Sequence, residues 1–327
     1  MSDMICGVDG GASKTHLALA DRQGRLRAFV AGPGTNHEGR GMRPIYRIFK
    51  TMLTRACRAA RCRPWDVRAG CFGLCGGDLP EDMAHIHREA VTPLGFNGPS
   101  LVTNDAFIAL FNDRWRDAGI AVTSGSWTKW LGMHGRRMFM HDGVGHLGIR
   151  LQATRELTRI HEGYRAPSPF TAALLRFTGF PSYAEYFNRT VYGDGKREYI
   201  RHTTPAQAER LRRVPEFLAA RAARRDPEAL RVLGRYADEL VEGTMAVVNR
   251  LGLRRVSHEL VLSGAVLAGN PILRRLFLAR LRPVSPRSRV VPATARPIRG
   301  ALMYAAHLAG WSLPASALRE PALIYAP

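Results

Sequence analysis

The first twenty residues constrain this chain more than any other stretch. Two short apolar runs, Met4–Val8 and Leu17–Ala20, flank a tight turn that contains Gly10, Gly11 and Ser13. Apolar runs around a glycine-rich turn of this length predict a β-hairpin. The two glycines let the backbone approach an anion closely, and successive N–H groups of a turn can hold phosphate oxygens. We therefore predict a phosphate-binding hairpin, with an ordinary hairpin as the alternative.

Polar residues in and beside this turn favour the phosphate interpretation. Ser13 and Thr15 supply hydroxyls and Lys14 supplies a positive charge. Asp9 is unusual inside an apolar strand, because a buried carboxylate costs several kcal/mol unless it is paired; Mg²⁺ is a suitable partner. The turn is not a P-loop, since Ser13 stands where that motif has glycine, and the chain has no G-x-G-x-x-G stretch.

Composition narrows the function classes. The 327 residues are enough for two domains with their own cores, and no apolar run approaches membrane-spanning length. Met1-Ser2-Asp3 leads directly into the first strand, which leaves no room for a signal peptide, so we expect a cytoplasmic protein without a membrane partner. The net charge of +21 comes from dispersed arginines without a basic tract and interleaved aromatics, so we do not expect nucleic acid as a partner.

All five cysteines lie in the first quarter of the chain. They are Cys6, Cys57, Cys62, Cys71 and Cys75, and none forms a C-x-x-C pair. A zinc or iron–sulfur site needs four ligands at workable spacing, which this arrangement lacks. We expect buried core thiols.

The first third of the chain predicts a mixed sheet. After the hairpin we expect a strand at Leu26–Val30, a loop at Gly32–His37 and a helix at Pro44–Ala60, where apolar residues recur at helical spacing. Two strand–helix units follow, led by the strands Val67–Leu74 and Ser100–Thr103. Ligands of such sheets lie beyond the carboxyl ends of the strands. The residues at these ends are Asp9, Gly10, Gly76, Gly77, Asp78, Asn104 and Asp105.

A second hairpin begins near residue 120. The strand Ile120–Ser124, the turn Gly125–Thr128 and the returning strand Lys129–Met133 predict a hairpin that faces the first. Two copies of a hairpin-led fold that enclose a nucleotide would explain both the length and the order of elements. The later elements that we expect are a loop over 141–148, a helical region over 167–225, a helix from Asp226-Pro227 to Gly252, the strand Leu260–Leu262, the turn Ser263–Ala265, the strand Arg289–Val291 and the helix Pro297–Leu308.

These motifs, in this order, resemble the N-acetylglucosamine kinase-like branch of the actin/Hsp70/sugar-kinase superfamily, which includes the BadF/BadG/BcrA/BcrD-type ATPases. The matching segments are Gly7–Thr15, Thr35–His37, Gly73–Asp78, Thr103–Ala106, Ser124–Ser126, Asp226–Leu230, Leu262–Val266 and Ala295–Leu302. The resemblance therefore extends over essentially the whole chain. It implies an α/β fold with two ribonuclease-H-like (actin-like ATPase) domains around a central cleft. One would span residues 1–117, with the helix at about 297–310 returning to it, and the other residues 118–296.

The resemblance implies an ATP-dependent sugar kinase that transfers the γ-phosphate to a hydroxyl of an amino sugar such as N-acetylglucosamine. Asp105 would take the proton from that hydroxyl, and Asp9 would organise Mg²⁺. ATP would be held by Gly10, Gly11, Ser13, Lys14, Thr15, Ser124, Gly125, Ser126, Thr128, Gly264 and Ala265. The sugar would be contacted by Asn36, His37, Gly77, Asp78, Asn104, Asp105, Gly143, Val144 and Gly145. Sugar and ATP would be the partners, and a homodimer is one option for assembly.

Two departures from the family pattern leave alternatives open. Trp127 stands where the second phosphate turn usually has a glycine, and His146-Leu147-Gly148 replaces a stretch whose acidic residue usually contacts the sugar. One alternative is a non-catalytic or altered-activity protein that binds sugar or nucleotide. Another is an ATPase that activates a radical dehydratase, but this would need cysteines near the second hairpin, and Cys75 is the last in the chain.

Overall fold

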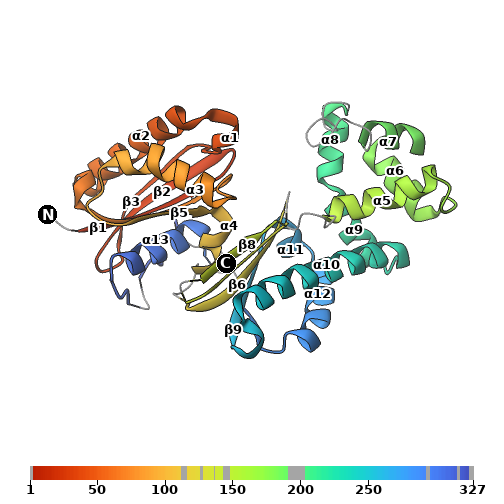
Figure 1. Cartoon of the computed structure of the whole chain (residues 1–327). Coiled ribbons are helices and arrows are strands. Elements are labelled where there is room, and N and C mark those ends of the chain that lie inside the picture. Colours follow the sequence, from red (N-terminus) through yellow and green to blue (C-terminus); the bar gives the residue numbers. More distant parts are fainter. Residues whose placement is uncertain are drawn as a thin grey trace.

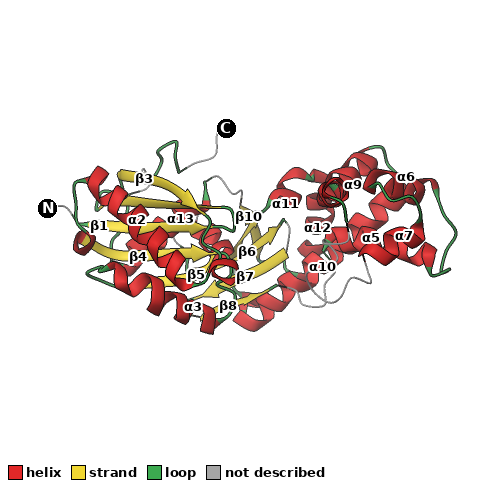
Figure 2. Ribbon diagram, turned by 90° about the horizontal axis from the view of Figure 1, so that it is seen from above, coloured by secondary structure: helices red, strands yellow, loops and turns green. Residues whose placement is uncertain are grey.

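Two five-stranded sheets with helices packed around them make up the structure (Figures 1 and 2). This computed structural model describes residues 3–111, 116–125, 128–135, 137–142, 148–190, 203–291, 295–314 and 317–323. The predicted α/β class is confirmed. Among the described residues, no helix is both long and apolar enough to cross a bilayer.

The first sheet has the strand order β3-β2-β1-β4-β5. Its strands are β1 (Met4–Gly10), β2 (Lys14–Asp21), β3 (Leu26–Pro33), β4 (Val67–Leu74) and β5 (Ser100–Asn104). Strands β1 and β2 form the predicted hairpin, in which Gly10 pairs with Thr15. Because β1, β4 and β5 run parallel, their carboxyl ends share one edge. The loop expected from Gly32 is shorter than predicted, since β3 continues to Pro33 and the loop is confined to residues 34–36.

Helices cover both faces of this sheet. They are α1 (His37–Arg40), α2 (Met42–Ala60), α3 (Pro80–Ile86), α4 (Asp105–Ile108) and, from the end of the chain, α13 (Pro297–Leu308). Helix α2 buries Ile45, Phe49 and Met52 in one core cluster with β1 and β4 residues. Helix α13 packs on the other face, where Leu302 comes so close to Gly7 that a Cβ there would lie 2.9 Å from it. Helix α13, near the end of the chain, thus covers one face of the sheet that begins near the start of the chain.

The second sheet has the order β10-β9-β6-β7-β8. Its strands are β6 (Ala118–Ser124), β7 (Thr128–His134), β8 (Arg137–His141), β9 (His258–Ser263) and β10 (Ser288–Val291). Strands β6 and β7 form the second predicted hairpin, with Ser124 opposite Thr128. Placing His141 in a loop was wrong, because it ends the edge strand β8 and stacks on Trp130 with ring centroids 5.0 Å apart.

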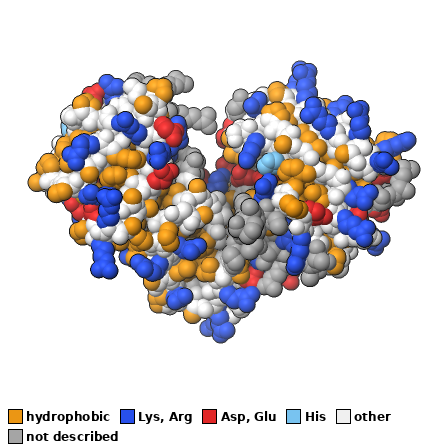
Figure 3. Space-filling model, turned by 180° about the vertical axis from the view of Figure 1, so that it is seen from behind, with side chains coloured by type: hydrophobic (Ala, Val, Ile, Leu, Met, Phe, Trp, Pro, Cys, Tyr) orange, Lys and Arg blue, Asp and Glu red, His pale blue; other side chains and the backbone are white. Residues whose placement is uncertain are grey.

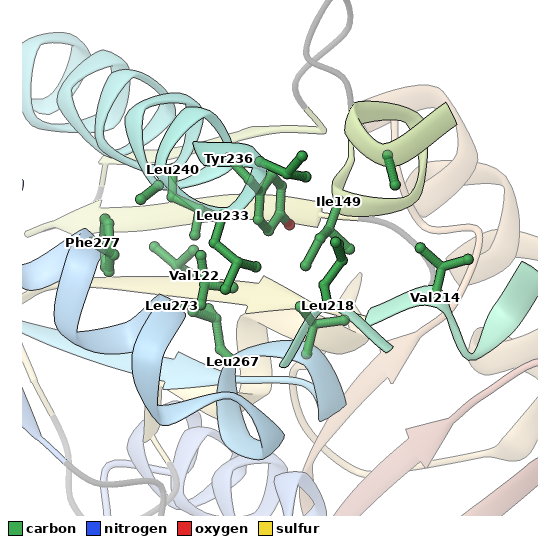
Figure 4. Packing of buried hydrophobic residues seen from close by; sticks show 14 of the residues in the cluster. Val122, Ile149, Val214, Leu218, Leu233, Tyr236, Leu240, Leu267, Leu273 and Phe277 are labelled. Carbon is green, nitrogen blue, oxygen red and sulfur yellow. The ribbon is translucent and has the colours of Figure 1, made fainter. Parts of the chain in front are cut away.

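Helices also surround the second sheet. They are α5 (Ile149–His161), α6 (Pro169–Thr178), α7 (Tyr183–Thr190), α8 (Pro205–Arg212), α9 (Val214–Ala223), α10 (Pro227–Leu251), α11 (Ala265–Gly269) and α12 (Pro271–Val284). Helix α10 begins and ends as predicted: Asp226 caps it, Pro227 is its first residue, and Gly252 ends it at φ 71°. Figure 4 shows its Leu233, Tyr236 and Leu240 in the core of this part.

Sequence reasoning missed α12. This helix carries several arginines that hide its apolar stripe, and only the stripe residues Leu273, Phe277 and Leu281 are buried. The turn that was expected to include Ala265 is also shorter, since Ala265 already begins α11.

Aromatic packing joins the two sheets. Phe111, in the short turn after α4, packs edge to face on Tyr304 of α13 at a centroid distance of 5.1 Å. Their cluster includes Ala121, Leu131 and Val261 of the second sheet. Seen from behind, the surface is hollowed between the part that holds the first sheet and the part that holds α5–α9 (Figure 3). The packing around Phe111 and Tyr304 therefore holds the two sheets next to each other.

Candidate active site

Three aspartates follow neighbouring strands of the first sheet. Asp9 is near the end of β1, Asp78 lies just beyond β4, and Asp105 directly follows β5 as the first residue of α4. The register holds these ends together, because Gly10 pairs with Leu74 and Leu74 pairs with Asn104. The structure thus brings the proposed metal residue, the proposed base and one proposed sugar contact to one edge.

Asp105 has the most perturbed carboxyl group at this edge. Burial raises the pKa of Asp105 from 3.8 to about 6. The ammonium of Lys129 and the backbone N–H of Ala106 oppose this rise in pKa, and the nearby carboxylates of Asp9 and Asp78 add to it. A carboxylate that titrates near 6 is matched to proton transfer at neutral pH.

Asn104 and Lys129 fix the position of Asp78. Asn104 Nδ2 donates to Asp78 Oδ1 at 2.6 Å, and Lys129 Nζ forms an ion pair with the same oxygen. Asn104 is fully buried, and its Oδ1 accepts a hydrogen bond from Ala106 N at 2.9 Å, which caps α4. The residue before the candidate base therefore anchors both its helix and Asp78.

The first hairpin presents a tight, exposed turn. Gly11 N donates to Lys14 O at 2.9 Å, while the side chains of Ser13 and Lys14 are exposed and free to meet a ligand. Thr15 points elsewhere: its hydroxyl is buried and bonds Thr35 Oγ1 at 2.9 Å. A Cβ at Gly10 would overlap the Thr35 hydroxyl, so Gly10 has a packing role at this point.

Asn36 and His37 lie beside the loop that follows β4. Asn36 caps α1 by accepting a hydrogen bond from Glu38 N at 3.1 Å. His37 Nε2 is 3.7 Å from Asp82 Oδ1, and its buried Nδ1 has no hydrogen-bond partner in the described part of the chain. Gly76, at φ 86°, could not carry a side chain, because a Cβ would lie 2.8 Å from Asn36 Oδ1. Gly77 follows it, with its Cα facing the carbonyls of Leu74 and Thr103.

The second hairpin is anchored by a residue that sequence reasoning missed. The hydroxyl of Tyr236, on α10, bonds both Ser124 Oγ and Thr128 Oγ1 at 2.6 Å. Ser124 and Thr128 are buried, so their hydroxyls face Tyr236. At Gly125 a Cβ would meet no atom of the described residues within 4 Å. The α10 pattern marked Tyr236 only as a core position, and no sequence signal gave its hydroxyl a partner.

Gly264 packs against the same hairpin. It stands between β9 and α11 at φ 87°, and a Cβ there would lie 2.6 Å from the carbonyl carbon of Ser124. Gly264 therefore touches the second hairpin directly, and Ala265, which follows it as the first residue of α11, is exposed. The predicted site residues Ser126, Gly143, Val144 and Gly145, and the departures at Trp127 and His146, lie outside the described residues.

The donors at the edge suit a hard cation. No cluster of three or more His, Cys, Asp or Glu side chains able to hold a metal ion is found among the described residues. Mg²⁺ usually binds proteins through one or two carboxylates and completes its shell with water and phosphate oxygens. Asp9 fits that pattern, since its carboxylate is 22% exposed and its nearest ionic partner, His16 Nδ1, is 3.9 Å away.

Comparisons with known proteins show similarity to sugar kinases. No protein-family model matches the chain. An N-acetylmuramic acid/N-acetylglucosamine kinase from Clostridium acetobutylicum is 24% identical over 272 residues, which cover 80% of this chain and 85% of that protein. The crystal structure assigned as an N-acetylglucosamine kinase from Chromobacterium violaceum superposes with a TM-score of 0.63 at 21% identity, covering 92% of this chain and 98% of the other.

A more distant structure has the same architecture. The ROK hexokinase of Thermus thermophilus has a TM-score of 0.56 at 17% identity and covers 92% of this chain and 97% of its own. The chain has the actin-like ATPase fold. The resemblance to the N-acetylglucosamine kinase-like proteins is also confirmed, and relatives of this kind support a phosphotransferase.

Proposed function

We propose that this protein is an ATP-dependent sugar kinase, which transfers the γ-phosphate of ATP to a hydroxyl of an amino sugar such as N-acetylglucosamine or a related sugar. The observation that carries the proposal is Asp105: a half-buried carboxylate with a pKa of about 6, beyond the end of β5, which interacts electrostatically with Lys129, Asp9 and Asp78. The relatives that act on amino sugars support the choice of substrate class.

Asp105 is the general base of this proposal. The sugar hydroxyl gives its proton to the Asp105 carboxylate as its oxygen forms a bond to the γ-phosphorus, and the bond to ADP breaks. In reactions of this type most of the rate comes from positioning and electrostatic stabilisation. Asp78, Asn104 and Gly77, with Asn36 and His37 beside the same loop, would position the sugar next to this base; Gly143, Val144 and Gly145 are proposed to complete the sugar side.

The two hairpins form the ATP side. Gly11, Ser13 and Lys14 would meet the phosphates from the first hairpin, and Gly125 and Ser126 from the second. Gly10, Thr15, Ser124 and Thr128 support these turns through the contacts described above. Gly264 and Ala265 would border the adenosine. When bound, Mg²⁺ would supply charge neutralisation at the phosphates, with Asp9 as its protein residue.

The proposed domain division follows the sheets. Residues 1–117 with α13 would form one domain and residues 118–296 the other, so that the sugar and ATP lie where the two meet. The packing of α13 on the first sheet supports its return to that domain. A cytoplasmic location and a homodimer remain proposals.

The decisive experiment is a substrate screen. Purified protein is incubated with ATP, Mg²⁺ and a panel of amino sugars, neutral sugars and aminocyclitols, and phosphorylated products are detected by the mass of one added phosphoryl group. We expect transfer to an amino sugar. Calorimetry that shows sugar or nucleotide binding without transfer to any compound would favour the non-catalytic alternative.

Tyr236→Phe gives a test of the second hairpin. The substitution keeps the aromatic packing and removes the hydroxyl that Ser124 and Thr128 share, so we expect a loss of about 1–3 kcal/mol in the free energy of unfolding. The loosened hairpin should raise the KM for ATP by several-fold and leave the KM for the sugar nearly unchanged. Tyr164→Phe, at an exposed tyrosine, is the matched control and should change neither KM.

A further inference from the structure

Lysine is rare in this chain. Of the 48 basic residues only four are lysines, namely Lys14, Lys50, Lys129 and Lys196. Two of the four stand near the start of the returning strand of a hairpin: Lys14 is the first residue of β2, and Lys129 is the second residue of β7. Lysine presents a compact point charge, whereas arginine presents a planar fork. Because the chain is so rich in arginine, a lysine at position 129 suggests a contact that a guanidinium group does not fit.

Lys129 reaches from the second sheet to the first. It lies on β7, yet its ammonium pairs with Asp78, which follows β4. The Lys129 side chain is only 17% exposed, so solvent screens this pair less than a surface pair. The contact therefore ties the ATP-side hairpin to the edge that carries Asp105.

The hydrogen bonds of Asp78 fix one of its carboxylate oxygens and leave the other accessible to a ligand. Its Oδ1 accepts from both Asn104 Nδ2 and Lys129 Nζ, while Oδ2 has no partner among the described residues. The Asp78 side chain is 38% exposed, so a ligand can reach it. A carboxylate fixed through one oxygen and open at the other is suited to accept a hydrogen bond from a sugar hydroxyl.

We propose that Lys129 is a positioning residue of the phosphotransfer site, which holds the Asp78 carboxylate in the orientation that binds the sugar. This inference rests on the proposed kinase function and deepens it. Because Lys129 belongs to the other sheet, the sugar contact is complete only when the two sheets are in the relative position seen here. The other titratable groups that interact at this point are Cys75, Glu38, Asp105 and Asp9, and none of them supplies a positive charge that could replace the ammonium.

The test compares four lysine variants with the sugar that the wild-type protein phosphorylates. Lys129→Met should raise the sugar KM by about 10-fold to 100-fold, as expected for loss of a charged hydrogen bond, and change the ATP KM by less than about twofold. Lys129→Arg should restore the charge but not the point contact, so that the sugar KM stays several-fold high. Lys50→Met and Lys50→Arg, at an exposed lysine on α2, are matched controls and should behave as wild type.

A double-mutant cycle separates positioning from a general effect on folding. If Lys129 positions the sugar through Asp78, then the sugar KM of Asp78→Asn combined with Lys129→Met should be no higher than the sugar KM of Asp78→Asn alone. Additive effects on the sugar KM, a raised ATP KM alone, or a wild-type sugar KM in both Lys129 variants would each overturn this inference while leaving the kinase function standing. A wild-type protein that phosphorylates no sugar would overturn both. Circular dichroism and melting temperature of each variant establish that the fold is retained.

Discussion

Asp105→Asn is expected to lower kcat for sugar phosphorylation by about 10²- to 10⁴-fold, the range that general-base catalysis contributes. The amide has nearly the same shape as the carboxylate but cannot take the proton from the attacking hydroxyl. Because Asn104, and not Asp105, caps α4 and holds Asp78, the surrounding contacts should survive. Sugar and ATP binding, measured by calorimetry, should therefore change little. Asp238→Asn, at an exposed aspartate of α10, is the control.

The pH dependence of the wild-type protein follows from the same group. Since the base must be ionised and the pKa of Asp105 is raised to about 6, kcat/KM should fall as the pH decreases through 6. Lys129→Met should move this acid limb to higher pH, because the ammonium of Lys129 lowers the pKa of Asp105. Full activity of Asp105→Asn, or an acid limb near pH 4 in wild type, would contradict the assignment of Asp105 as the base.

Asp105→Asn should also make the protein more stable at neutral pH. A carboxyl group whose pKa is raised on folding stabilises the folded state while protonated, and this contribution is lost as the pH rises from about 4 through 6. A shift of about two pKa units corresponds to at most roughly 3 kcal/mol. The stability difference between variant and wild type, from urea unfolding, should be near zero at pH 4 and approach this value above pH 6.

Gly264→Ala is expected to destabilise the protein strongly. The backbone at Gly264, with φ 87° and ψ 148°, is in a region that only glycine occupies readily, which costs another residue about 1–3 kcal/mol. The new Cβ would also overlap the backbone of Ser124, and forced repacking of this kind costs about 1–3 kcal/mol more. We therefore expect a loss of about 4 kcal/mol in the free energy of unfolding, together with weaker ATP binding.

Gly252→Ala separates the cost of the backbone conformation from the cost of the steric overlap. Gly252 also has a positive φ, 71°, but a Cβ there meets nothing within 4 Å, so only the backbone cost of about 1 kcal/mol should appear. Urea unfolding of both variants gives the comparison, and calorimetry with ATP gives the functional readout. Equal losses in the two glycine variants would show that the contact between Gly264 and Ser124 does not matter.

The sequence alone determined much of this protein, because its signals are local. The glycine turn predicts the first hairpin from neighbouring residues, and the Asp226 cap with Gly252 sets the limits of α10. The order of the strands placed Asp9, Asp78 and Asp105 at one edge, since parallel strands end on the same side. The spacing of apolar residues and the residue types at turns carry this information without any long-range contact.

Only the tertiary structure decided which polar groups meet across the fold. Tyr236 reads as one more apolar position of α10 until its hydroxyl is seen to hold Ser124 and Thr128, more than a hundred residues earlier. Lys129 reads as a strand residue until its ammonium reaches Asp78 from the other sheet. The raised pKa of Asp105 likewise depends on burial, which arises only in the folded chain. Contacts between distant segments have no periodicity in the sequence, and so the geometry of the site came from the packing.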